Sequence, residues 1–165
     1  MRERNLKNLR TEDTGLLYLQ EKIKGFCRLQ DIKDTETKKI IYERDISKEG
    51  RKLLFDIAGI DHKKYWKSVD GVILNVKNLN EVKTIDDYEF IEVKTTASPT
   101  IKKLPYGVWF GFTQNEEEFA KNVKNYKLCF VHTVFKKHCF ITYDEYEELI
   151  EIKRIQYQIN FKEMP

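Results

Sequence analysis

A chain of 165 residues that is 41% hydrophobic has the size and apolar content of one globular domain with a buried core. Its 30 Lys and Arg residues against 27 Asp and Glu residues leave a net charge of +3, which is too small to indicate a nucleic-acid partner by itself. No apolar stretch approaches the roughly 18 residues of a membrane span and the N-terminus is charged, so we expect a cytoplasmic protein with no membrane partner.

The three cysteines, Cys27, Cys129 and Cys139, lie among apolar residues and form no C-x-x-C pair. Their odd number and their spacing favour reduced, mostly buried thiols over a disulfide framework or a zinc site. The chain also contains no G-x-x-x-x-G-K motif. Because that motif cradles the phosphates of a bound nucleotide, we expect no nucleotide cofactor.

The first two thirds of the chain are predicted to begin with a helix and to continue as strands. Segment 11–26 has apolar residues at helical spacing, with Thr11 and Asp13 as candidate caps and Gly25 near its end. β-type runs separated by polar or glycine-containing breaks predict strands over 26–32, 38–43, 52–60, 70–76, 88–95 and 106–112. We therefore expect an antiparallel or mixed sheet in the middle of the chain.

Two capping-box patterns predict where helices begin in the C-terminal third. Thr113 with Glu116 predicts the start of a helix over 113–126, and Thr142 with Glu145 predicts one over 142–154. Strands are expected over 127–135, 138–141 and 155–161, the last because its apolar residues alternate. This order predicts a single domain, 1–165, of the α/β (α+β) class, in which helices flank a central mixed sheet.

The segment FIEVKTT (90–96) contains two candidate catalytic residues, Glu92 and Lys94. In a strand the side chains at i and i+2 share a face, so Glu92 and Lys94 project together while Ile91 and Val93 take the other face. A hairpin from strand 70–76 would place Asp70 opposite Glu92. Two carboxylates suit Mg²⁺, which takes only one or two from the protein, and a nearby lysine can orient water or stabilise negative charge during phosphodiester hydrolysis.

These residues resemble a known motif. VDG (69–71) followed by IEVK (91–94) resembles the PD-(D/E)XK pattern of restriction-endonuclease-like nucleases, with Val69 where the pattern often has proline. FIEVKTT followed by WFGFTQNEEEFAKNVKNYKLCFVHTV (109–134) resembles the C-terminal domain family of the plant NO VEIN protein, which is also found in prokaryotic defence proteins. The N-terminal third of the chain matches poorly.

The resemblance implies a restriction-endonuclease-like fold and a DNA endonuclease that depends on Mg²⁺, for which Mn²⁺ can substitute. It implies that Asp70 and Glu92 bind the metal, that the backbone carbonyl of Val93 is a further ligand and that Lys94 is the catalytic lysine. A restriction or defence role follows, with DNA as the partner. An enzyme that reads a symmetric DNA site is expected to act as a homodimer.

Three alternatives concern the identity of the site residues. The family core adds a helical glutamate, for which we favour Glu12 over Glu21. Asp56, in LLFDIAG, is a rival for the role of Asp70. A second E-x-K occurs at 81–83, but its neighbours are loop-like, so we prefer the copy in the apolar strand.

Basic and polar residues flank the expected site. Lysines on either side could contact DNA phosphates, a tryptophan could stack on a base, and the start of helix 113–126 could receive a phosphate on its free N–H groups. In the simpler interpretation Thr113 and Glu116 only cap that helix. The candidate DNA contacts are Lys64, Trp66, Lys102, Lys103, Gln114 and Asn115.

Alternative functions stay open on the sequence. Glu92 and Lys94 could form an ion pair on the solvated face of a strand, with no chemistry. In that case the chain would be an inactive DNA-binding or partner-binding module. A structure-specific resolvase or repair nuclease is a third possibility, and it would cut branched DNA in preference to linear duplex.

Overall fold

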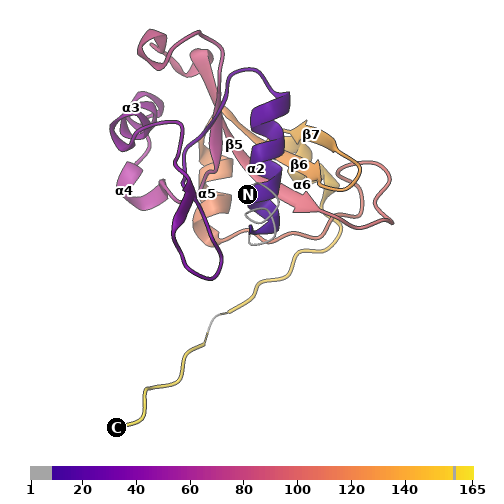
Figure 1. The fold of residues 1–165 in the computed structure, drawn as a ribbon. Coiled ribbons are helices and arrows are strands. Elements are labelled where there is room, and N and C mark those ends of the chain that lie inside the picture. Colours follow the sequence, from indigo (N-terminus) through magenta and orange to yellow (C-terminus); the bar gives the residue numbers. More distant parts are fainter. Residues whose placement is uncertain (1–8, 158) are drawn as a thin grey trace.

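The computed structural model describes residues 9–157 and 159–165 (Figure 1). Its helices are α2 (Thr11–Lys22), α3 (Lys48–Ala58), α4 (His62–Tyr65), α5 (Gln114–Asn122) and α6 (Tyr143–Leu149), with short 3₁₀ turns at Leu79–Glu81 and Ile85–Asp87. Its strands are β1 (Phe26–Arg28), β2 (Ile32–Lys33), β3 (Ile40–Tyr42), β4 (Gly71–Leu74), β5 (Tyr88–Thr96), β6 (Tyr126–His132) and β7 (Lys137–Ile141).

A five-stranded sheet in the order β1-β4-β5-β6-β7 forms the centre of the protein. β5 and β6 pair in parallel through the α5 crossover, whereas the other neighbouring strands are antiparallel. β2 and β3 form a separate antiparallel pair. The expected α+β class, with helices flanking a central mixed sheet, is thus confirmed.

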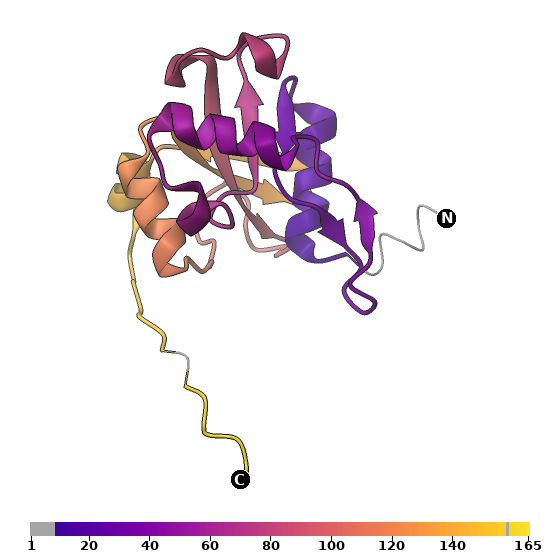
Figure 2. The same ribbon diagram turned by 90° about the vertical axis from the view of Figure 1, so that its left-hand side faces the viewer.

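Helices cover both faces of the sheet. α2 lies on one face and α3, α4 and α5 lie on the other, as the two views show (Figure 1, Figure 2). Leu16 and Leu19 of α2 pack with Ile91 and Val93 of β5 in one apolar cluster. The approach is close at Gly15, where a Cβ atom would lie 2.6 Å from Cγ2 of Thr95, so a larger residue there would force the helix away.

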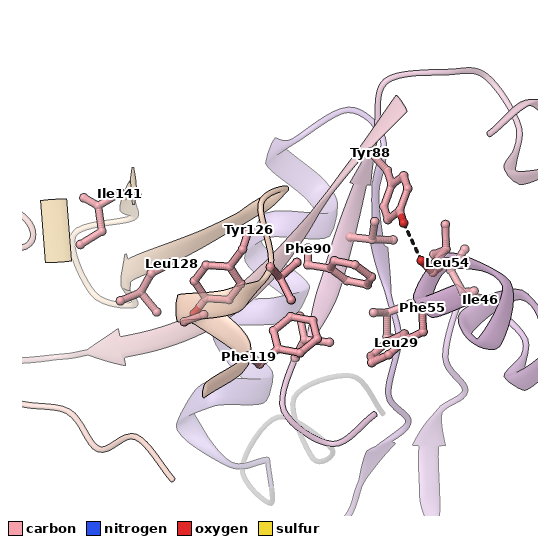
Figure 3. Packing of buried hydrophobic residues seen from close by; sticks show 14 of the residues in the cluster. Leu29, Ile46, Leu54, Phe55, Tyr88, Phe90, Phe119, Tyr126, Leu128 and Ile141 are labelled. Carbon is pink, nitrogen blue, oxygen red and sulfur yellow. Dashed lines mark hydrogen bonds between the residues drawn. The ribbon is translucent and has the colours of Figure 1, made fainter. Parts of the chain in front are cut away.

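The larger apolar cluster fills the other face (Figure 3). Phe90 of β5 meets Phe55 of α3 and Phe119 of α5 edge to face, and the Phe90 ring centroid lies 5.2 Å from each of the other two. Tyr88 donates its buried hydroxyl to the carbonyl of Leu54. Two residues of β5, Tyr88 and Phe90, therefore continue this core up to Glu92 on the same face.

The predicted strand 52–60 is wrong, because α3 occupies that segment. Ser47 caps the helix by accepting the N–H of Gly50, and Gly59 ends it with a φ of 70°. Leu54 and Phe55 are buried one turn after Arg51, a helical spacing. A short apolar run fits a strand or a buried helix equally well, and here the two end signals decide.

Two other predicted strands are also wrong. Segments 106–112 and 155–161 contain no strand within their described residues, since neither has a neighbouring strand to bond with. The second segment leads away from the body of the protein, and its described side chains are exposed (Figure 1). Strand 26–32 is interrupted and forms β1 and the start of β2.

Helix starts were predicted with mixed success. The capping boxes of Thr113 and Thr142 are both present, at the starts of α5 and α6. Thr11 and Asp13 do not cap α2: Arg10 takes the cap position, and its side chain pairs with Asp13 at 3.1 Å. Of the helices in the described residues, none has both the length and the apolar character needed to cross a membrane. The three cysteines are free thiols.

Candidate functional site

The β4–β5 hairpin places Asp70 beside the middle of β5. Gly71 pairs with Ile91, and the N–H of Asp70 donates to the Ile91 carbonyl at 3.1 Å. β4 begins only after Asp70. The next N–H on the β4 side of β5 is that of Val93, and it donates to Oδ2 of Asp70 at 2.8 Å instead of to a strand carbonyl. The carboxylate is therefore held at the strand edge, opposite Glu92 as the sequence predicted.

Glu92 and Lys94 share one face of β5, also as predicted. They follow Tyr88 and Phe90 on the face that meets α5, and both are buried, with 4% and 6% of their surfaces exposed. Lys94 Nζ lies 3.3 Å from Oε1 of Glu92. Because both side chains are buried, they do not form a solvated surface pair. Burying two charges costs several kcal/mol each, so the site has to supply compensating partners.

Glu116 completes this charged group and was missed as a site residue. Its Oε2 accepts a hydrogen bond of 3.1 Å from Lys94 Nζ. Glu116 is the third residue of α5, where the sequence indicated only a capping role. Its spacing from Thr113 signalled the helix start, but nothing local signalled that the helix would cross Lys94. The ammonium nitrogen also lies 5.3 Å from the centre of the Phe112 ring.

Burial and like charges control ionisation in this group. Burial raises the pKa of Asp70 to about 6, although the Val93 N–H opposes the shift. Burial and then the charge of Asp70 raise the pKa of Glu92 well above its usual range. Burial alone would lower the pKa of Lys94, but Glu92 and Glu116 outweigh it and the net shift is upward. Lys94 is therefore a firmly protonated ammonium group.

The structure separates the alternative carboxylates. Glu12 lies in the first turn of α2. After burial, its negative charge makes the next largest upward contribution to the pKa of Asp70. Glu21 is exposed near the other end of that helix. Asp56 is exposed on α3. The geometry thus favours Glu12 and Asp70.

A cleft of about 520 Å³ opens between α4 and the start of α5. It contains four of the six candidate DNA contacts, and its lining residues are Lys63, Lys64, Trp66, Lys67, Ser68, Thr113, Gln114, Asn115 and Glu116. Three lysines and a partly exposed indole make its wall basic and aromatic. Trp66 is steadied by the Arg51 guanidinium, 4.4 Å from its ring centre.

The other two candidate contacts lie elsewhere. Lys102 and Lys103 are exposed in the loop after β5, where their ammonium groups lie over the rings of Phe135 and Tyr106. Neither lines the cleft. The sequence placed them near the site because they follow FIEVKTT closely, but the loop carries them past the end of the strand.

Two buried oxygen atoms near the charged group have no hydrogen-bond partner among the described residues: Oε2 of Glu92 and the hydroxyl of Tyr126. An unpaired buried carboxylate oxygen is costly, and a cation or water would satisfy it. No group of three or more His, Cys, Asp or Glu side chains suited to a metal occurs in the described part of the chain. A protein site with one or two carboxylates is compatible with Mg²⁺, which keeps several waters.

Comparisons of the chain with protein-family models, with curated proteins and with solved structures gave no match in any of the three.

Proposed function

We propose that this protein is a Mg²⁺-dependent DNA endonuclease of the restriction-endonuclease-like class, with Mn²⁺ as a substitute ion. The observation that carries the proposal is the meeting of Asp70, Glu92 and Lys94 at one end of the β4–β5 hairpin, with Lys94 Nζ 3.3 Å from Glu92 and Asp70 bonded to the backbone of β5. The motif's resemblance to PD-(D/E)XK and the mixed sheet around it support the same fold class.

The residues present fit a divalent cation. Glu92 Oε2 is buried without a partner among the described residues. Burial disfavours ionisation of both Glu92 and Asp70, and the charge of Asp70 raises the pKa of Glu92 further. A bound cation would relieve both costs. Asp70 and Glu92 would hold Mg²⁺, with the Val93 carbonyl as a third ligand. The N–H and C=O of a strand residue point to the same side, and the Val93 N–H points to Asp70.

When bound, Mg²⁺ supplies positive charge to a phosphoryl oxygen and lowers the pKa of a bound water. Lys94 contributes as a cation: its ammonium group donates hydrogen bonds to the attacking water or to the phosphate oxygens on which negative charge develops. Although burial lowers the pKa of Lys94, the charges of Glu92 and Glu116 raise it, so we assign its ammonium group the role of orienting the water. Glu12 is a candidate further acid beside Asp70.

The cleft supports DNA as the substrate. Lys63, Lys64 and Lys67 can contact phosphates, and Trp66 offers a ring on which a base can stack. Glu116 lines the cleft and also binds Lys94, which connects this basic surface to the buried carboxylates. A restriction or defence role and a homodimer that reads a symmetric site belong to the same proposal.

The test is cleavage of supercoiled plasmid and of linear phage DNA with Mg²⁺, Mn²⁺ or EDTA. Wild type should cut with either metal, whereas Glu92→Gln and Lys94→Met should reduce the rate by at least about 100-fold, the scale seen on removal of one charge-stabilising group. Glu89→Gln is the matched control, because Glu89 is on the same strand and pairs with Lys127 at 3.1 Å, outside the site. It should cut like wild type.

Adding a DNA-binding measurement and a four-way junction substrate to this assay separates the alternatives. DNA binding by wild type without cleavage in any metal would identify an inactive binding module. Strong preference for a four-way junction over linear duplex would identify a resolvase or repair nuclease. Discrete fragments from phage DNA would identify a sequence-specific enzyme.

A further inference from the structure

We propose that Glu116 is a positioning residue, which holds the Lys94 ammonium group at the junction of the buried carboxylates and the cleft. This inference rests on the proposed nuclease function and adds a residue to its site. Glu116 comes from α5, the crossover helix between β5 and β6, so it lies outside the E-x-K motif.

The contacts of Lys94 show why a second carboxylate is needed. Its Nζ lies 3.3 Å from Oε1 of Glu92 and 3.1 Å from Oε2 of Glu116. If Glu92 binds Mg²⁺, its oxygens are shared with the cation and hold the ammonium group less well. A lysine side chain has four rotatable bonds, so it loses its orientation without a fixed acceptor. Glu116 supplies that acceptor.

The position of Glu116 is itself rigid. It is the third residue of α5, and the capping box ties it to Thr113: its N–H donates to Oγ1 of Thr113 at 3.1 Å, while its carboxylate accepts the Thr113 N–H at 3.5 Å. The side chain is therefore held by two contacts, one with the helix start and one with Lys94. A carboxylate that only capped the helix would not need to reach Lys94.

Glu116 also sets the direction in which Lys94 points. It is a lining residue of the cleft, whereas Glu92 and Asp70 are not. Its contact with Lys94 therefore holds the buried ammonium group next to a side chain that lines the cleft. The predicted capping role and the positioning role therefore belong to the same side chain.

The experiment uses Glu116→Gln, because glutamine also serves at this capping-box position and so preserves the helix start while removing the charge. The matched control is Glu145→Gln, since Glu145 has the same position in the capping box of α6 and is exposed. Single-turnover cleavage is measured at saturating DNA over a range of Mg²⁺ concentrations. We expect Glu116→Gln to slow the maximal rate about 10- to 100-fold and Glu145→Gln to leave it unchanged.

The Mg²⁺ dependence distinguishes positioning from metal binding. The half-saturating Mg²⁺ concentration of Glu116→Gln should stay within about twofold of wild type, because Glu116 acts through Lys94. A large rise in that concentration with a normal maximal rate would overturn the inference and make Glu116 a metal ligand. Equal rates for Glu116→Gln and Glu145→Gln would overturn it in favour of a capping role alone.

A second readout does not depend on activity. Urea unfolding measures the equilibrium constant for unfolding of Glu116→Gln, Lys94→Met and the double variant. The changes in its logarithm should be non-additive, because the two side chains contact each other. Additive changes would overturn the inference. Wild type that fails to cleave DNA would overturn the proposed function and the positioning role with it, whereas an active wild type with an unaffected Glu116→Gln overturns the positioning role alone.

Discussion

The backbone N–H of Val93 donates a hydrogen bond of 2.8 Å to Oδ2 of Asp70, at the place where β4 has not yet begun and β5 continues. The carboxylate thus takes the position that a strand carbonyl would otherwise occupy. This keeps Asp70 next to the charged face of β5, and its role can be tested by a substitution that preserves the hydrogen bond.

Asp70→Asn should abolish metal-dependent cleavage while the protein stays folded. The amide oxygen can still accept the Val93 N–H, but a neutral amide is a poorer ligand for a hard cation than a carboxylate. Plasmid cleavage and circular dichroism measure the two effects. Asp56→Asn, on the exposed face of α3, is the control and should be as active as wild type. Loss of cleavage in Asp56→Asn with normal activity in Asp70→Asn would reverse the assignment.

Glu92→Gln should make the metal-free protein more stable, by about 1 kcal/mol. In wild type the Glu92 carboxylate is buried, its Oε2 has no partner among the described residues, and Asp70 repels it. A neutral amide removes the repulsion, and Lys94 keeps Glu116 as its partner. Urea unfolding in EDTA measures the change. A large loss of stability would show that the Glu92–Lys94 pair is mainly structural.

Mg²⁺ should raise the melting temperature of wild type and leave that of Glu92→Gln unchanged. A ligand that binds only the folded state stabilises it by RT ln(1 + [L]/Kd), and Glu92 is one of the two carboxylates expected to hold the ion. Thermal unfolding is followed with increasing MgCl₂ against matched concentrations of NaCl, which corrects for ionic strength. Equal shifts in both proteins would place Mg²⁺ elsewhere.

Lysines of the cleft should contribute to DNA affinity more than lysines of the loop after β5. Lys64→Gln and Lys67→Gln should each weaken binding and lower the slope of log affinity against log salt by about 1, because each lysine neutralises one phosphate. Lys102→Gln and Lys103→Gln should leave both quantities unchanged. Fluorescence anisotropy in the Glu92→Gln background, which binds without cutting, gives the comparison.

The contribution of His62 to stability should fall as pH decreases below about 6.5, the usual pKa of a histidine in an unfolded chain. Burial and the nearby Arg51, Lys52 and Lys48 lower its pKa, while Asp56 opposes the shift. The neutral ring accepts a hydrogen bond from Arg51 Nε at 3.2 Å. The unfolded chain therefore binds the proton more readily, and protonation favours unfolding. His62→Gln keeps an acceptor but does not titrate. Urea unfolding at several pH values should therefore show a difference in the free energy of unfolding between wild type and this variant that changes only between the unfolded pKa of His62 and its lower folded pKa.

Local sequence signals were sufficient for much of the site. The period of two in a strand places Glu92 and Lys94 on one face whatever lies around them. The capping boxes at Thr113 and Thr142 depend on residues three apart, and both helices begin where they predict. The apolar strand after Asp70 was expected to return as a hairpin, and it does.

Segments with ambiguous local signals were predicted less well. The apolar run at 52–60 fits a helix or a strand, and 155–161 alternates like a strand but has no strand beside it among the described residues. A strand needs a partner for its backbone groups, and a partner is a property of the whole fold.

The sequence by itself determined which residues of FIEVKTT share a face, where the last two helices begin, and that an acid and a lysine would meet on a strand. Only the tertiary structure decided that Glu116 reaches Lys94, that Lys64 and Trp66 share a cleft with Gln114 and Asn115, and that Lys102 and Lys103 do not. The reason is physical: periodicity and capping act over two to four residues of chain, whereas contacts between α4, α5 and β5 depend on how their side chains pack together.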